Sequence, residues 1–114
     1  MAAVYVNNLV VNSGTDFSQS FTLEGSYNNS PLNLTGYTVA AQMRKWSGSS
    51  AAITFETLIE SPPTDGRLLI HLPYTDTTNI RPGRYVYDVI ITDSFGIKNR
   101  VIEGMVLVRE GVTK

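Results

Sequence analysis

The chain has 114 residues, of which 42% are hydrophobic and 17% are charged, and its nine basic and ten acidic side chains give a formal net charge of −1. This length predicts one folded domain covering residues 1–114, and the absence of cysteine excludes disulfide bonds. Basic residues are scattered singly, which argues against a nucleic-acid partner, and no apolar run approaches the roughly 20 residues of a membrane-spanning helix. The first residues lack the charged start and apolar core of a signal peptide, so we expect synthesis in a cytoplasm.

The first half of the chain consists of predicted extended segments separated by loops. Val4 to Val11 is extended but interrupted by Asn7-Asn8, a pattern that indicates an edge strand. Asp16 to Glu24 alternates apolar and polar side chains, as a half-buried strand does. A loop rich in Gly, Asn and Ser leads to Thr38–Arg44, which alternates again. The polar segment that follows carries Trp46, the only tryptophan.

The second half contains four more predicted strands and no sustained helical period. These strands are Ile53 to Glu60, Leu68 to Leu72, Arg84 to Thr92 and Lys98 to Arg109. A short turn with Asp and Gly joins the last two, so they should pair as an antiparallel hairpin. About seven short strands separated by turn signals predict an all-β fold, in which two antiparallel sheets pack as a β-sandwich.

The strand from Arg84 to Thr92 is central to this prediction. Tyr85 and Tyr87 share its inner face, and Gly83 lets the backbone bend into the sheet after Pro82. In immunoglobulin-like domains, a tyrosine near the start of the sixth strand donates a hydrogen bond from its hydroxyl to the backbone just upstream. Tyr85 matches that tyrosine, and Tyr87 takes the place of the second cysteine of the usual disulfide. We therefore predict a single immunoglobulin-like sandwich without a disulfide and with an apolar, aromatic core.

Short motifs at strand starts and turns run through most of the chain in a fixed order and spacing. They are Asp16-Phe17, Leu34-Thr35-Gly36-Tyr37, Ala41-Gln42-Met43-Arg44, Asp65-Gly66 with Leu72-Pro73, Pro82-Gly83-Arg84-Tyr85-Val86-Tyr87-Asp88, and Gly104-Met105-Val106-Leu107-Val108 with Val112-Thr113. Together they resemble the immunoglobulin-like domains at the N-termini of bacteriophage baseplate upper proteins and of other tail and fibre-attachment proteins. The resemblance implies a structural subunit of the virion, made in the host cytoplasm, whose partners are other virion proteins and copies of itself.

In that family the domain commonly precedes a coiled coil or a receptor-binding part. This sequence stops soon after its last predicted strand, at Lys114. The resemblance therefore favours a single-domain adaptor or decorating subunit over a receptor-binding protein.

No arrangement of residues predicts catalysis or a metal site. His71 is the only histidine, and the alternation of its strand points it outward, away from any nucleophile. The acidic residues are dispersed, without the spacing of a calcium loop, and no phosphate-binding glycine loop occurs. Asp88 lies on the outward face of its strand and needs a cationic partner, either Arg100 or Arg44. We therefore expect a protein that is not an enzyme and that uses no cofactor or metal.

The outer face of the final hairpin is the predicted partner interface. Met105, Leu107 and Arg109 alternate with the inward residues of the last strand, and Val86 and Ile90 join them from the strand before. Soluble monomers seldom expose such a contiguous apolar patch without a partner. The alternative is a β-bulge that reverses the register locally and buries Met105. Of these two interpretations we favour the interface.

Trp46 and Tyr37 support an alternative hypothesis, in which the chain is a carbohydrate-binding or adhesin-like module. Exposed aromatic rings can form a platform on which sugars stack. The simpler interpretation, which we favour, folds Trp46 back over the open end of the sandwich. The resemblance, together with the predicted interface, therefore implies first a non-enzymatic virion protein at the baseplate, the tail or a fibre attachment point, and second a protein that decorates the capsid.

Overall fold

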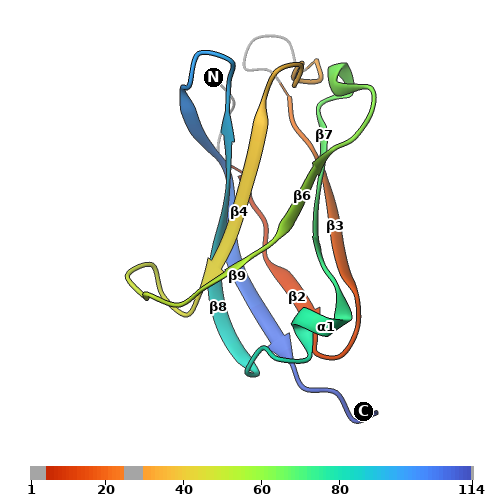
Figure 1. Ribbon diagram of the computed structural model, residues 1–114, viewed down its shortest axis with the longest axis vertical. Coiled ribbons are helices and arrows are strands. Elements are labelled where there is room, and N and C mark those ends of the chain that lie inside the picture. The colour runs from red at the N-terminus through yellow and green to blue at the C-terminus, as the bar shows by residue number, and fades with distance from the viewer. Residues whose placement is uncertain (1–4, 25–29, 114) are drawn as a thin grey trace.

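The computed structural model describes residues 5–24 and 30–113 and shows two β-sheets packed face to face (Figure 1). Two helical turns, η1 (Pro63–Asp65) and α1 (Tyr74–Thr77), lie in connections between strands. Within the described ranges, no helix is long and apolar enough to cross a membrane. The strands are β1 (Tyr5–Val6), β2 (Leu9–Asn12), β3 (Phe17–Thr22), β4 (Thr38–Arg44), β5 (Ala52–Thr54), β6 (Glu56–Ile59), β7 (Arg67–Leu72), β8 (Gly83–Thr92) and β9 (Lys98–Arg109).

The larger sheet has six strands in the order β1-β9-β8-β4-β5, with β2 following β1 along the same side of β9. The smaller sheet has the order β3-β7-β6. The hydrophobic core lies between the sheets, because successive side chains of a strand point to opposite faces. On β7, for example, Leu68, Ile70 and Leu72 are fully buried, whereas the residues between them are partly exposed. The predicted all-β sandwich is confirmed.

The described residues form nine strands, because two of the predicted strands are divided. The first predicted strand, Val4 to Val11, divides at Asn7-Asn8 into β1 and β2. Both pair in parallel with β9, so the large sheet is not wholly antiparallel as predicted. Its predicted first residue, Val4, lies outside the described residues. The fourth predicted strand, Ile53 to Glu60, divides at Phe55. β5 pairs with β4 in the large sheet, and β6 pairs with β7 in the small one. Phe55 is buried and donates its backbone N–H to the Ala41 carbonyl oxygen at 3.0 Å, which fixes the crossing point.

The corner that leads into β8 has the predicted geometry. The Tyr85 hydroxyl donates a hydrogen bond to the Arg81 carbonyl oxygen at 2.7 Å, and only 9% of Tyr85 is exposed. Gly83 has a φ of 142°, which favours glycine, and a Cβ there would lie 2.7 Å from Lys45 Nζ. This Nζ also lies 4.9 Å from the centre of the Tyr85 ring, a cation–π contact. The corner and the strand order together show an immunoglobulin-like sandwich.

Tyr87 occupies the centre of the core, as predicted from its place on β8. Its ring and the ring of Phe55 are arranged edge to face, with ring centres 6.3 Å apart. Its hydroxyl donates a hydrogen bond to the Asn7 carbonyl oxygen, which ties the link between β1 and β2 to the core. Burial raises the pKa of Tyr87 from 10.0 to about 12, because the apolar surroundings disfavour the charged phenolate.

The link Asn7-Asn8 passes close beside β9 at Gly104, where there is no room for a side chain. The Asn7 N–H donates to the Glu103 carbonyl oxygen at 3.0 Å, and the Met105 N–H donates to Asn8 Oδ1 at 3.0 Å. A Cβ at Gly104 would collide with the Asn7 carbonyl oxygen between these two bonds. The close approach of the two backbones therefore depends on glycine at this position.

Gly104→Ala should lower the free energy of unfolding by about 1–3 kcal/mol, the usual cost of overpacking. Alanine in place of a strand glycine would otherwise stabilise the chain, by roughly 0.5–1 kcal/mol. Urea denaturation of both proteins measures the difference and its sign. A variant at least as stable as the wild type would contradict the close approach.

Candidate functional site

An apolar patch lies on the outer face of the six-stranded sheet and consists of Val10, Val86, Met105 and Leu107. Val10, Met105 and Leu107 are 50%, 46% and 42% exposed, and Val86 is half-buried. Strand pairing puts Val86 opposite Met105 and Val10 opposite Leu107, so the four side chains are neighbours across three strands. A shallow concavity of about 230 Å³ lies over the β2–β9 side of this patch.

Two arginines form a rim at one end of the apolar patch. Arg84, on β8, is exposed and lies opposite Leu107 on β9. Arg109 is also exposed and follows Leu107 by two residues, so both side chains point to the outer face. The patch therefore combines an apolar centre with positive charge at its edge.

The β-bulge that was the alternative to this interface is present, but it does not bury Met105. The pairing of β8 with β9 shifts after Val89, so that Val101 becomes an extra residue, and Val101 and Ile102 are both fully buried. Such bulges place two residues of one strand opposite one residue of its partner. Met105 lies beyond the shift and keeps its outward direction. No sequence signal marks the position of this bulge.

Ile90 does not belong to the apolar patch, which corrects the predicted interface. Arg100 Nε lies 3.2 Å from Asp88 Oδ2, and Arg100 Nη1 lies 3.7 Å from Glu103 Oε1. This ion-pair cluster lies between Ile90 and Val86 on the sheet face. Its side chains are 35–55% exposed, so it contributes little to stability. Of the two cationic partners predicted for Asp88, Arg100 is the one that binds it.

A polar hollow of about 730 Å³ adjoins the apolar patch on the same sheet face. It lies between the β4–β5 connection on one side and the ion-pair cluster on the other. Arg44 is held in its wall, since Nη2 donates to Gln42 Oε1 at 3.1 Å and Nη1 donates to the Ser49 carbonyl oxygen. Side chains from β4, the β4–β5 connection, β8 and β9 line it, namely Gln42, Arg44, Trp46, Asp88, Ile90, Arg100 and Glu103.

Trp46 lines this hollow and is 61% exposed, so it does not cover the open end of the sandwich as we had favoured. It lies in the β4–β5 connection, which projects from the side of the sandwich in Figure 1. Tyr37 precedes the other end of β4 and packs against the core. The two rings therefore do not form the aromatic platform considered from the sequence.

His71 is partly exposed on the outer face of the small sheet, as its alternation predicted. Its Nδ1 lies 2.7 Å from Glu56 Oε2 on the neighbouring strand. Across residues 5–24 and 30–113, no three His, Asp or Glu side chains come together as metal ligands would. We therefore assign His71 a cross-strand contact and no place in a candidate site.

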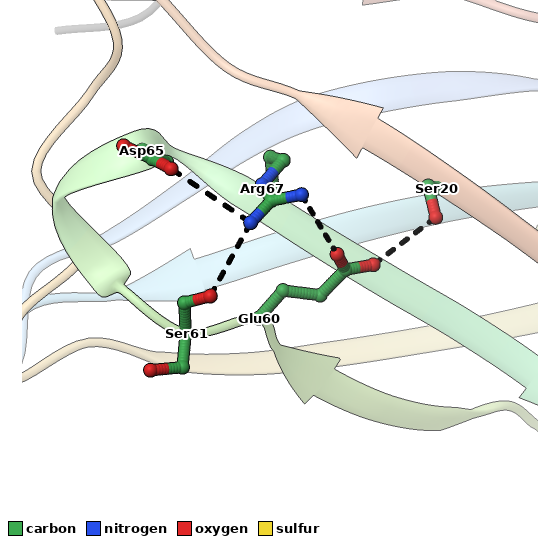
Figure 2. Close-up of polar contacts among 5 residues, drawn as sticks. All are labelled: Ser20, Glu60, Ser61, Asp65 and Arg67. Atoms are coloured by element: carbon green, nitrogen blue, oxygen red, sulfur yellow. Dashed lines mark hydrogen bonds and ion pairs between the residues drawn. The ribbon is translucent and has the colours of Figure 1, made fainter.

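A second cluster of polar contacts, centred on Arg67, holds the turn before β7 (Figure 2). Arg67 Nη2 donates to the Ser61 carbonyl oxygen at 3.2 Å and lies 3.7 Å from Asp65 Oδ2, and Nη1 lies 3.5 Å from Glu60 Oε2. Glu60 Oε1 accepts a hydrogen bond from the Ser20 hydroxyl at 3.1 Å. These contacts join β3, the turn and β7, which is a structural role.

No protein-family model matches this chain, and no curated protein sequence matches it. Among solved structures it is similar to an SrpA adhesin variant from Streptococcus sanguinis, with a TM-score of 0.51 and 12% identity, over 96% of this chain and 57% of the adhesin chain. An internalin-like protein from Listeria monocytogenes gives a TM-score of 0.43 at 12% identity, over 95% of this chain and 28% of that one. A family 123 glycoside hydrolase from Clostridium perfringens gives 0.46 at 12% identity, over 96% and 24%.

The adhesin comparison bears on the fold alone, because the identity is so low. The chain is an all-β immunoglobulin-like sandwich that has no disulfide. It spans little more than half the length of the adhesin chain that it matches.

Proposed function

We propose that this chain is a non-enzymatic structural subunit of a bacteriophage particle and that it docks through its apolar patch. The proposal is supported by the resemblance of its motifs to immunoglobulin-like virion domains. The observation that carries it is the patch itself: Val10, Met105 and Leu107 are each at least 42% exposed and lie side by side on the sheet. Large exposed apolar groups that adjoin one another mark interaction surfaces. Within the particle, our first choice of location is the baseplate, the tail or a fibre attachment point, and our second choice is the capsid surface, as a decorating protein.

The partner that best fits this patch is an apolar surface with an acidic rim on another virion protein. Interfaces combine an apolar centre with a polar edge, and complementary charges at that edge set the orientation of the partners. Here Arg84 and Arg109 supply positive charge beside Leu107. A second copy of this chain is the competing occupant, and solution measurements distinguish the two.

Replacing both Met105 and Leu107 by Lys should leave the protein folded but abolish docking. Exposed substitutions usually change the free energy of unfolding by only about 0.5 kcal/mol. Docking should fail because two ammonium groups would be desolvated against an apolar partner. Circular dichroism and thermal melts test folding, and quantitative mass spectrometry of gradient-purified particles tests incorporation. The matched control is Leu58→Lys with Phe95→Lys, which adds the same charge at exposed apolar residues outside the patch.

The outcomes separate the virion role from the choice of surface. Absence of the wild-type protein from purified particles would overturn the virion role. A folded Met105→Lys/Leu107→Lys variant that is incorporated as well as the control would overturn the patch as the docking surface. Light scattering after size exclusion completes the test: a wild-type dimer that the double variant loses would identify a second copy as the occupant, in place of a different virion protein.

A further inference from the structure

The polar hollow has the size and the lining of a small-molecule site. Its volume of about 730 Å³ falls within the roughly 300–1,000 Å³ that is usual for such sites. Val86 and Ile90 supply the apolar part of its lining, and polar side chains come from β8 itself and from the strands on either side of it. We propose that this hollow binds an uncharged saccharide unit of a glycan, stacked on Trp46. This proposal goes beyond the docking function and does not depend on it.

Trp46 supplies the aromatic surface that such a ligand needs. Trp46 as a whole is 61% exposed, and its large apolar side chain borders the polar hollow. The six-membered ring of Trp46 lies close against Gly48, where an added Cβ would collide with it. The position of the indole therefore depends on glycine at residue 48. The carbon-bound hydrogens of a pyranose ring pack well on an aromatic face, because that face is apolar and carries partial negative charge.

The polar side chains of the hollow are held in place and still have hydrogen-bonding capacity. Gln42 donates from Nε2 to Thr54 Oγ1 at 3.3 Å and accepts from Arg44. Asp88 and Glu103 each use one carboxylate oxygen on Arg100. A carboxylate accepts about four hydrogen bonds through its two oxygens, so Asp88 and Glu103 keep acceptor capacity beside their contacts with Arg100. Fixed acceptors beside fixed donors match the hydroxyl groups of a sugar, each of which both donates and accepts.

The charge of the hollow favours a neutral ligand over an acidic one. Arg44 and Arg100 are balanced by Asp88 and Glu103, so two positive and two negative groups leave no net charge. A site for phosphate or for an acidic sugar would need an excess of positive charge to offset the desolvation of the anion. Here a bound anion would meet two carboxylates. An uncharged hexose or deoxyhexose unit is therefore the chemical class that fits.

The intrinsic fluorescence of the protein provides a direct test, because Trp46 is the only tryptophan. The labelled protein is first applied to an array that carries neutral, sialylated and phosphorylated oligosaccharides. Neutral oligosaccharides that bind are then titrated against the unlabelled protein. Binding should shift the tryptophan emission to shorter wavelength as the exposed indole is covered. Binding to none of the neutral oligosaccharides, or only to the acidic ones, would overturn the proposal.

Three variants test the residues of the site, with calorimetry as the readout where tryptophan is lost. Trp46→Ala should weaken binding roughly tenfold or more, since stacking on an aromatic side chain contributes about that much. Gly48→Ala keeps the indole but displaces it, so binding should weaken while folding is unchanged. Asp88→Asn should weaken binding of the same saccharide several-fold. Equal affinity of all three variants and the wild type would place the saccharide elsewhere and overturn the assignment.

Two controls separate this site from other aromatic surfaces and from docking. Phe95→Ala removes an aromatic residue that is 89% exposed in the turn between β8 and β9, and it should bind the saccharide as the wild type does. The Met105→Lys/Leu107→Lys variant should also retain saccharide binding while losing incorporation into particles. Failure of one activity is thus distinguishable from failure of the other.

Discussion

Tyr85→Ala should be the most destabilising of the substitutions considered, lowering the free energy of unfolding by about 3–5 kcal/mol. The side chain is 9% exposed, so its removal leaves a cavity the size of an aromatic ring in the core. It also removes the hydrogen bond to the Arg81 carbonyl oxygen and the ring beneath Lys45 Nζ. Tyr85→Phe keeps the ring and loses only the hydroxyl, so it should cost about 0.5–1.5 kcal/mol.

Urea denaturation of both Tyr85 variants would separate the contribution of the hydrogen bond from that of the ring. The matched control is Tyr74→Ala, because the Tyr74 side chain is 57% exposed at the start of α1. This control should change stability by only about 0.5 kcal/mol. If Tyr85→Phe were as stable as the wild type, the hydroxyl would have no role in holding the corner.

Stability should fall steeply in alkaline solution because of Tyr87. Its pKa is raised from 10.0 in the unfolded chain to about 12 in the folded protein, so the folded state favours the neutral phenol. The corresponding stabilisation is fully present below pH 10 and is lost as the pH rises through 12. Two pKa units correspond to about 2–3 kcal/mol of unfolding free energy.

Tyr87→Phe cannot ionise at this position, so its stability should depend less on pH between 10 and 12 than that of the wild type. Urea denaturation at several pH values in this interval measures the slope for each protein. Ultraviolet absorbance of the phenolate should also show one late-ionising tyrosine that the variant lacks. Parallel slopes for the two proteins would contradict the linkage. The variant should be less stable at neutral pH, because it loses the hydrogen bond to Asn7.

The features that the sequence predicted are those with a local pattern. The alternation of buried and exposed residues on β7 and β8 follows directly from the order of apolar side chains. The position of Tyr85 after Pro82 and Gly83 predicted both its burial and its bond to the upstream backbone. The outward direction of Met105 and Leu107 followed from the alternation of inward and outward residues along the second half of β9.

The features that the sequence did not predict depend on contacts between distant segments. The fourth predicted strand divides at Phe55 because the segment before it pairs with β4 and the segment after it pairs with β7, and strand propensity does not indicate which partner a segment takes. The parallel pairing of β2 placed Val10 beside Leu107, so Val10 was missed from the patch. Trp46 lies in a connection whose path is set by Gly48 and by Arg44, and hydrophobic periodicity carries no information about such a path.

The position of β9 has a consequence for the order in which the protein folds. β9 follows the other described strands in the sequence, yet it lies between β8 and the strands β1 and β2, and Tyr5 pairs with Ile102. The large sheet therefore cannot close until residues Lys98–Arg109 have emerged from the ribosome. Until then one edge of β8, which is rich in valine, isoleucine and tyrosine, has no partner and can pair with other chains. We expect slow folding dominated by non-local pairing, with a nascent chain that benefits from chaperones while this edge is open.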